Sequence, residues 1–151
     1  TGAMAPKWVA EARGSFVGLT TSHGRAELAR AVLEGNSFAM RDVLDRLLEL
    51  GARVDRVRLA GGGARSPLWA QMRADLTQLP VETLTASDAS ATGAAVLAAV
   101  AAGLYSDVAA AVAALELKTE TIAPDAGKAA AYDEAYHHYR EVFAALEPAW
   151  R

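Results

Sequence analysis

Residues 59–69 read Leu59-Ala60-Gly61-Gly62-Gly63-Ala64-Arg65-Ser66-Pro67-Leu68-Trp69. The segment that leads into it, Val54 to Ala60, alternates basic and apolar side chains at its centre, which is typical of a strand with one buried face. Within the stretch, Ser66 and Pro67 supply a favoured N-cap and a favoured first helical residue. The sequence therefore predicts a strand, a glycine turn and a helix N-terminus in direct succession.

The glycine turn is the one feature of the sequence that carries recognisable chemistry. Glycine has no Cβ, so a ligand can lie directly against its backbone, and the N–H groups at a helix start favour anions. Ligands of open α/β sheets also bind beyond the carboxyl ends of strands, where this turn must lie. The alternative is a turn that only reverses the chain, because the spacing of Gly61, Gly62 and Gly63 matches neither the Walker loop nor the dinucleotide fingerprint. The pattern alone leaves both interpretations open.

The residues around the turn predict further helices and strands. A long helix is expected from about Gly24 to Leu50, with one continuous apolar face and Gly51 as its C-terminal cap. The helix that begins at Ser66 is stopped by Pro80, and Val81 to Leu84 is expected to form a strand.

An alanine-rich helix is expected to follow as far as Ala102, with Asp88 or Ser90 as its N-cap and Gly103 as its C-cap. Strands that alternate with helices indicate an α/β fold whose strands pair mainly in parallel. Two strands make a poor sheet, so further strands are expected outside this chain or in stretches without a clear pattern. The remaining expectations are a loop and then a short strand over 8–21, a lesser helix over 106–115, a loop over 118–127, and a last helix with Tyr132, Tyr136, Tyr139, Phe143 and Leu146 on one face.

Composition limits the possible partners. The 151 residues suffice for one domain with a hydrophobic core, and the net charge of −3 argues against nucleic acid. The chain has no cysteine, which excludes disulfides and fits a cytoplasmic location. It also has no run of about 18 apolar residues, so no membrane span is expected. We expect residues 1–7 to be a tag remnant and lead-in, and residues 8–151 to form a single domain.

Most polar side chains that could carry chemistry have a simpler interpretation. The adjacent His137 and His138 point in different directions on a helix, which favours a solvated face over a metal site, and His23 is expected in a loop. Arg65, beside the glycine turn, is kept as a candidate nucleotide contact. Three carboxylates are interpreted as surface or capping groups: Asp75, Asp88 and Asp125.

The run from Gly61 to Trp69 resembles the adenosine-binding turn of the FGGY carbohydrate kinases, in the form typical of members that act on xylulose. Near the start, Lys7, Val9 and Ala10 depart from the usual family pattern. The resemblance implies the actin-like ATPase fold, in which two ribonuclease-H-like domains hold ATP and sugar between them, with this chain as the C-terminal domain. Other stretches resemble the family in the same order along nearly the whole chain: Pro6-Lys7-Trp8, Glu11 to Leu19, Arg30 to Gly35, Gly93-Ala94-Ala95, Gly103, Tyr132 and Tyr139-Arg140.

The resemblance also implies which residues bind the nucleotide. The triple-glycine turn would lie against base and ribose, and Ser66 stands near an asparagine that contacts adenine in some relatives. Glu34 and Gly35 could approach the purine from the long helix. The catalytic aspartate, the phosphate loops and most sugar and Mg²⁺ contacts are expected upstream of this chain, so no catalytic residue is expected within it. The residues carried over to the turn are Gly61, Gly62, Gly63 and Ala64.

The function that the resemblance implies is transfer of a phosphoryl group from MgATP to the terminal hydroxyl of D-xylulose, which gives D-xylulose 5-phosphate. The isolated chain is expected to bind ATP or ADP weakly and to be inactive, because sugar and catalytic base belong to the other domain. Ribulose, gluconate and glycerol are alternative substrates. A nucleotide-binding or regulatory module without kinase activity is an alternative of another class, and a homodimer is one candidate assembly.

Overall fold

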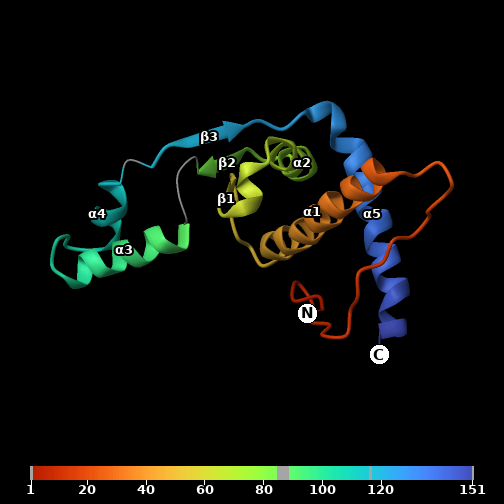
Figure 1. Cartoon of the computed structure of the whole chain (residues 1–151), viewed down its shortest axis with the longest axis horizontal. Helices are drawn as coiled ribbons and strands as arrows, with labels where there is room; N and C mark the ends of the chain where they lie inside the picture. Colours follow the sequence, from red (N-terminus) through yellow and green to blue (C-terminus); the bar gives the residue numbers. More distant parts are fainter. Residues whose placement is uncertain (1, 85–88, 116, 151) are drawn as a thin grey trace. The chain divides into compact units, whose positions relative to one another are not determined.

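The computed structural model describes residues 2–84, 89–115 and 117–150, and the chain divides into two compact units (Figure 1). The first unit comprises Thr1–Val54, Asp75–Gln78 and Asp125–Arg151. The second comprises Asp55–Ala74 and Leu79–Pro124. Each unit has its own hydrophobic cluster.

The second unit contains a three-stranded sheet of order β1-β2-β3, formed by Val57–Leu59, Val81–Leu84 and Thr119–Ile122 (Figure 1). Strands β1 and β2 are parallel, with Val57 opposite Val81, whereas β3 runs antiparallel to β2. The two expected strands and their parallel pairing are thus confirmed, and with them the α/β fold class. The expected loop over 118–127 is wrong in its first half, which forms strand β3.

The strand β3 owes its conformation to both its composition and its partner. Thr119, Thr121 and Ile122 are β-branched, and such side chains favour extended backbone. Pro124, two residues beyond Ile122, favours a loop, so the sequence alone predicts no strand here. The exposed edge of β2 supplies the backbone hydrogen bonds that make the segment a strand.

Helix α2, Pro67–Thr77, joins β1 to β2 and packs on one face of the sheet. Ala70 and Ala74 are 0% exposed, so the helix backbone comes close to Leu59 and Val81 of the sheet. The Ser66 hydroxyl accepts a hydrogen bond from the Trp69 N–H at 3.3 Å, which confirms the predicted N-cap.

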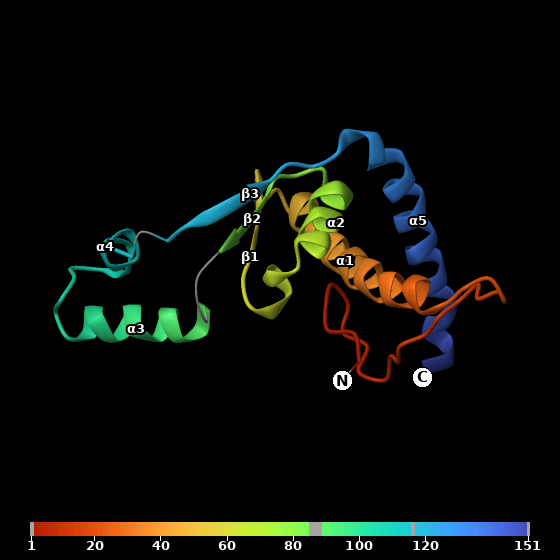
Figure 2. The same ribbon diagram turned by 45° about the horizontal axis from the view of Figure 1, so that its top comes forward.

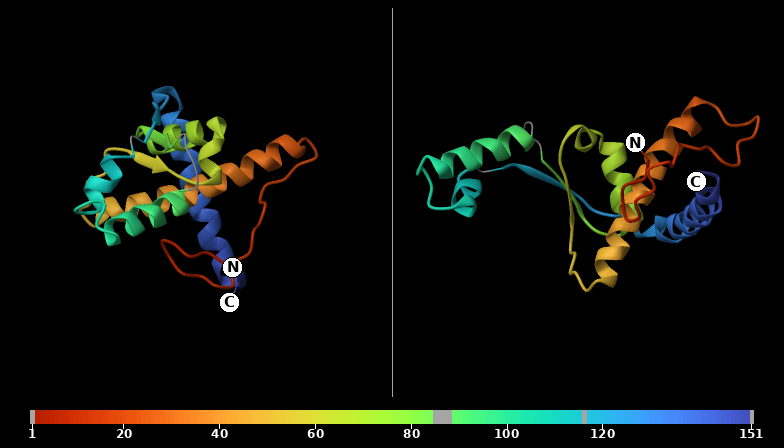
Figure 3. Two further views of the ribbon diagram at one scale, coloured as in Figure 1. Left: turned by 60° about the vertical axis from the view of Figure 1, so that its left-hand side comes forward. Right: turned by 90° about the horizontal axis from the view of Figure 1, so that it is seen from below.

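Helices α3, Ala89–Ala101, and α4, Val108–Ala113, lie side by side in the second unit (Figure 3). Gly103 has a φ of 74°, and the Leu104 N–H donates to the Ala99 carbonyl at 2.9 Å, which confirms the predicted C-cap. Ser90 lies within α3, and Asp88 lies outside the described residues. Helix α4 starts two residues later than expected, because the Asp107 carboxylate caps it by accepting the Ala110 N–H at 2.8 Å.

The first unit is built on helix α1, Arg25–Glu49, whose limits agree with the expected helix. The Gly24 N–H donates to the Glu27 carboxylate at 2.8 Å at one end. At the other end Gly51 has a φ of 85°, which confirms it as the cap. The apolar face is only partly covered, since Val32 and Leu47 from it are exposed in the chain. The buried residues of α1 are instead Ser37, Phe38 and Leu44.

Helix α5, Ala129–Leu146, packs its aromatic face against α1, as expected (Figure 1). The ring centroids of Phe38 and Tyr139 lie 5.4 Å apart. The buried Tyr136 hydroxyl donates to Asp42 Oδ1 at 2.8 Å. Burial, and then the contact with Asp42, raises the pKa of Tyr136 far above its ordinary range, so the phenol stays protonated.

The expected strand at the end of residues 8–21 is wrong. The one pairing that this segment makes in the described part of the chain is an isolated bridge, in which the Ala3 N–H donates to the Val9 carbonyl at 2.9 Å. Phe16, Val17 and Leu19 are exposed. A strand needs a neighbour to satisfy its backbone, and a short apolar segment without one remains a loop. In the described ranges no helix is both long and apolar enough to cross a membrane.

Asp75 is a second correction, because it is a buried carboxylate and not a surface group. Its side chain lies at the end of α2 and is 1% exposed. Oδ1 accepts the Asp125 N–H at 2.9 Å, and Oδ2 accepts from Lys128 Nζ at 2.9 Å. Asp125 itself caps the short 3₁₀ helix η2, Ala126–Lys128, as predicted, by accepting the Gly127 N–H. Asp75 therefore fixes the chain that leads into α5.

Replacing Asp75 with alanine tests this role. The change removes the acceptor of the Asp125 N–H and the partner of Lys128. We expect the free energy of unfolding, measured by urea denaturation, to fall by about 2–3 kcal/mol, because hydrogen bonds to a buried charge outweigh neutral ones. Glu134→Ala, on the exposed side of α5, is the control. Equal stabilities of the two variants would show that the Asp75 contacts contribute nothing.

The sheet face opposite α2 carries an ion cluster with a predictable response to pH. Arg58 Nη2 lies 2.6 Å from one oxygen of Glu82, and Arg56 Nη1 lies 2.8 Å from the other. Hydrogen bonds from Arg58, and then from Arg56, hold the pKa of Glu82 below its ordinary value of 4.5. A lowered carboxyl pKa means that the stabilisation is complete above the ordinary value and is lost as the pH falls through the lower one.

We therefore expect Glu82→Gln to flatten the acid side of the stability curve. Wild-type chain and variant are compared by urea denaturation from pH 7 down to pH 3, and the stability difference between them should shrink below about pH 4.5. Glu134→Gln serves as the matched control, because that carboxylate is exposed on α5. A difference between wild type and Glu82→Gln that stays constant over the whole range would contradict the assignment.

Candidate functional site

The glycine turn follows β1 and becomes the 3₁₀ helix η1, Gly62–Arg65, before α2 begins. Gly61 has φ 80° and ψ −165°, a conformation that is essentially restricted to glycine. The Ala64 N–H donates to the Gly61 carbonyl at 3.1 Å and closes the turn. The first glycine is thus required by the backbone alone.

Gly63 has a different reason to be glycine. A Cβ at this position would lie 2.9 Å from the ring of Trp69, which packs against the turn. The guanidinium of Arg73 lies over the Trp69 ring, 4.0 Å from the ring centroid. This cation–π contact holds the indole in place, and the indole in turn leaves no room for a side chain at Gly63.

Gly62 has no such reason within the fold. It lies in a 3₁₀ helix, where its φ is one that any residue adopts, and a Cβ built on it meets no atom within 4 Å. The N–H groups of Gly62 and Gly63 precede the first hydrogen bond of η1, so helix geometry leaves them without an intrahelical acceptor. Backbone that is open on one side and begins a helix is suited to a ligand that lies close against it.

The other turn residues predicted as nucleotide contacts differ in how they are engaged. Ala64 is half-buried against the sheet cluster, whereas the Arg65 side chain is exposed. The Ser66 hydroxyl caps α2, so it already accepts a hydrogen bond from Trp69. The structure brings these predicted residues together in one turn at the carboxyl end of β1.

A hollow of about 220 Å³ lies beside the turn within the second unit. Four of its residues come from the sheet, and the two polar ones, Thr83 and Glu120, were not predicted as site residues. Glu120 could not be predicted as a site residue because its strand was expected to be a loop. The register of β3 against β2 places it beside the turn. The lining consists of Ala64, Arg65, Pro67, Ala70, Thr83, Leu84, Glu120 and Ile122.

The two predicted contacts outside the turn, Glu34 and Gly35, lie on α1 in the first unit. The Glu34 carboxylate accepts from Arg30 Nε at 2.8 Å. Gly35 lines a hollow of about 520 Å³ between α1 and the segment Gly14 to Leu19. Their role at the nucleotide remains a prediction, since they and the turn belong to different units.

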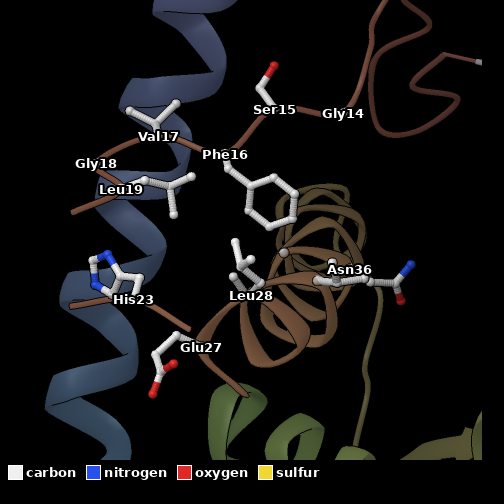
Figure 4. Close-up of a pocket in the computed structure, with 13 residues that line it drawn as sticks. Gly14, Ser15, Phe16, Val17, Gly18, Leu19, His23, Glu27, Leu28 and Asn36 are labelled. Carbon is white, nitrogen blue, oxygen red and sulfur yellow. The ribbon is translucent and has the colours of Figure 1, made fainter. Parts of the chain in front are cut away.

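The hollow of the first unit has an apolar floor (Figure 4). Phe16 points toward Leu28 of α1, with His23 and Glu27 at the rim. The His23 Nδ1 accepts the Thr20 N–H at 2.9 Å, so this ring atom orders the loop before α1, as expected for a loop histidine. The arrangement offers apolar contact and no nucleophile activated by a base.

Metal ligands are not gathered in the described residues, where no group of three or more His, Asp or Glu side chains is placed to hold an ion. His137 and His138 lie exposed on α5, in agreement with the predicted solvated face. The chemistry that the described site can perform is therefore binding: close backbone contact, helix-start N–H groups, an exposed guanidinium and a carboxylate beside them.

Comparisons with known proteins point to one family. Residues 1–102 match the FGGY family of carbohydrate kinases, C-terminal domain. The xylulose kinase of Escherichia coli K12 is 40% identical over 139 residues, which cover 91% of this chain and 28% of that protein. The glycerol kinase of Rhodospirillum centenum is 44% identical over 109 residues, which cover 72% of this chain and 22% of that protein. The crystal structure of xylulose kinase from Rhodospirillum rubrum matches with a TM-score of 0.77 and 36% identity, over 92% of this chain and 28% of that one. The chain thus spans less than a third of the length of these relatives.

Alanine substitutions separate the structural glycine from the open one. Gly61→Ala should lower the free energy of unfolding by about 1–3 kcal/mol, because a Cβ is strained at that φ and ψ. Gly62→Ala should leave stability unchanged or raise it by up to about 1 kcal/mol, because alanine restricts the unfolded chain and fits η1. Both are measured by thermal and urea unfolding. A large loss in Gly62→Ala would show that the fold itself requires the second glycine.

Proposed function

Because the chain belongs to the FGGY family of carbohydrate kinases, we propose that it forms the nucleotide-binding domain of an ATP-dependent sugar kinase. In this proposal residues 8–151 are one domain of that enzyme, and the glycine turn holds the adenosine part of ATP. The residues proposed to contact the nucleotide are Gly61, Gly62, Gly63, Ala64, Arg65 and Ser66 from the turn, with Glu34 and Gly35 from α1.

The observation that carries the proposal is the open position at Gly62. Gly61 and Gly63 are explained by the backbone and by Trp69, but nothing in the described fold occupies the space over Gly62. At the end of a strand and the start of a helix, such an open glycine is suited to a ligand that lies against the backbone. Its place, at the carboxyl end of a parallel strand and the start of a helix, supports a nucleotide as that ligand.

We further propose D-xylulose as the sugar, with phosphorylation of its terminal hydroxyl as the reaction. The form of the turn at Arg65, Ser66 and Pro67 and the similarity to xylulose kinases support this choice. Glycerol is the second candidate, because a glycerol kinase shares the highest identity of the reported relatives over a shorter stretch. The choice of sugar rests on residues that we place outside this chain.

In phosphoryl transfer the protein acts mainly by positioning the reactants and by stabilising charge on metal-bound phosphates. Of these two tasks, we assign to the described residues the positioning of the nucleoside. Mg²⁺ enters the proposal with the ATP phosphates, and we assign it no ligand among the described side chains. We place the catalytic base in another part of the enzyme, so the isolated chain should not phosphorylate a sugar. We place the enzyme itself in the cytoplasm.

An amide-resolved NMR titration of the chain with ADP and with D-xylulose tests this proposal. ADP should shift the amides from Gly61 to Ser66 at millimolar concentration, and the sugar should shift none of them. The matched variant is Gly62→Ala, whose Cβ fills the open space without touching the fold. It should weaken ADP binding by about 10-fold or more, because a methyl group keeps the nucleoside off the backbone.

Two outcomes would overturn the proposal. If the amide signals of the turn do not shift even at about 10 mM ADP, the chain does not bind nucleotide there. If Gly62→Ala binds ADP as well as the wild type, the open position does not serve the ligand. Turnover of D-xylulose and MgATP by the purified chain would contradict the assignment of catalysis to another part of the enzyme.

A further inference from the structure

The antiparallel direction of β3 brings a carboxylate to the edge of the sheet where the glycine turn lies. Strands β1 and β2 are parallel, so their carboxyl ends, Leu59 and Leu84, lie at one edge. Because β3 runs the other way, its amino end lies at this same edge (Figure 2). The register places Glu120 directly opposite Thr83. Glu120 thus stands where ligands of α/β sheets bind.

The register also decides which face of the sheet Glu120 occupies. Side chains alternate along a strand, and Val81 is buried against α2, so Thr83 lies on the α2 face as well. Glu120 pairs with Thr83 and shares that face, together with Ile122. Its neighbour Thr121 pairs with Glu82 and lies on the opposite face. The carboxylate therefore faces the same side as the turn that begins α2.

The hollow beside the turn unites these groups. It is lined by Ala64 and Arg65 from the turn, by Thr83 from β2 and by Glu120 from β3. Its volume of about 220 Å³ is below the roughly 300–1,000 Å³ of pockets that enclose a drug-sized ligand. It is therefore of a size to take one part of a nucleotide and not the whole molecule.

The chemistry of the lining selects which part that is. An ionised carboxylate only accepts hydrogen bonds and repels phosphate, so the part of a nucleotide that it contacts must be a neutral donor, either a ribose hydroxyl or a base amino group. A ribose offers two adjacent hydroxyls, whose protons match the two carboxylate oxygens and whose oxygens can accept from Arg65 or Thr83. Carboxylates bind ribose hydroxyls in this way at other α/β nucleotide sites.

We propose that Glu120 is a specificity-determining residue, which accepts hydrogen bonds from the ribose hydroxyls of a nucleotide held on the glycine turn. The inference rests on the proposed function, since it requires the nucleotide to lie on that turn. It goes further by assigning selectivity for a ribose over a deoxygenated sugar to one carboxylate of the edge strand.

The test compares the dissociation constants of ADP and 2′,3′-dideoxy-ADP, measured by NMR titration of the chain. The wild type should bind ADP about 10-fold or more tighter, because hydrogen bonds to a charged group are lost with the hydroxyls. In Glu120→Ala this ratio should fall several-fold toward one, while the affinity for the dideoxy nucleotide stays as in the wild type. Glu120→Gln, which keeps one acceptor, should give an intermediate ratio.

Thr121→Ala is the matched control, because it alters the same strand on its opposite face, and it should keep the wild-type ratio. A ratio near one in the wild type, or a ratio that Glu120→Ala leaves unchanged, overturns the role of Glu120 while ADP binding at the turn still stands. A lower affinity of Glu120→Ala for both nucleotides alike also overturns it, since that pattern indicates damage to the fold. If ADP itself fails to bind, the proposed function falls and the inference with it.

Discussion

The close approach of α2 to the sheet is the constraint on which the candidate site depends. Ala70 and Ala74 have no exposed surface, and their small side chains let the helix backbone lie directly over Leu59 and Val81. With larger residues there, the start of α2 would stand away from the end of β1. The connection between them would then have room for a wider turn than the one that Gly61 forms. Packing in the core thus sets the conformation of the backbone that we assign to the nucleotide.

The family match confirms the resemblance seen in the sequence, including the assignment to the C-terminal domain of the FGGY family and to the actin-like ATPase fold. Signals that act over a few residues were sufficient for most elements. Ser66 and Pro67 start α2, and Gly51 and Gly103 end α1 and α3, because each cap depends on local backbone geometry. The aromatic face of α5 was also predictable from its spacing.

What could not be predicted depends on partners far away in the sequence. The segment over 119–122 is a strand because β2 offers it an edge, and Phe16 to Leu19 is not a strand because the described chain offers it none. Asp75 is buried because the distant Asp125 and Lys128 complete its hydrogen bonds. The glycine turn was predicted as a site, whereas Glu120 became visible only with the register of β3. Patterns over a few neighbouring residues contain no information about partners that lie far away in the sequence.

The open space over Gly62 has a consequence for how this domain can change over generations. A glycine codon turns into one for alanine, serine or a larger residue by a single base change, and at this position the fold offers such a side chain no obstacle. Under the proposed function, one point mutation would therefore separate a nucleotide-binding domain from a folded relative that binds nucleotide less tightly. Selection for a stable, soluble chain would not remove that mutation, and only selection for the kinase reaction would. The turn is thus a place where an enzyme lineage could begin to lose nucleotide affinity while it keeps its fold.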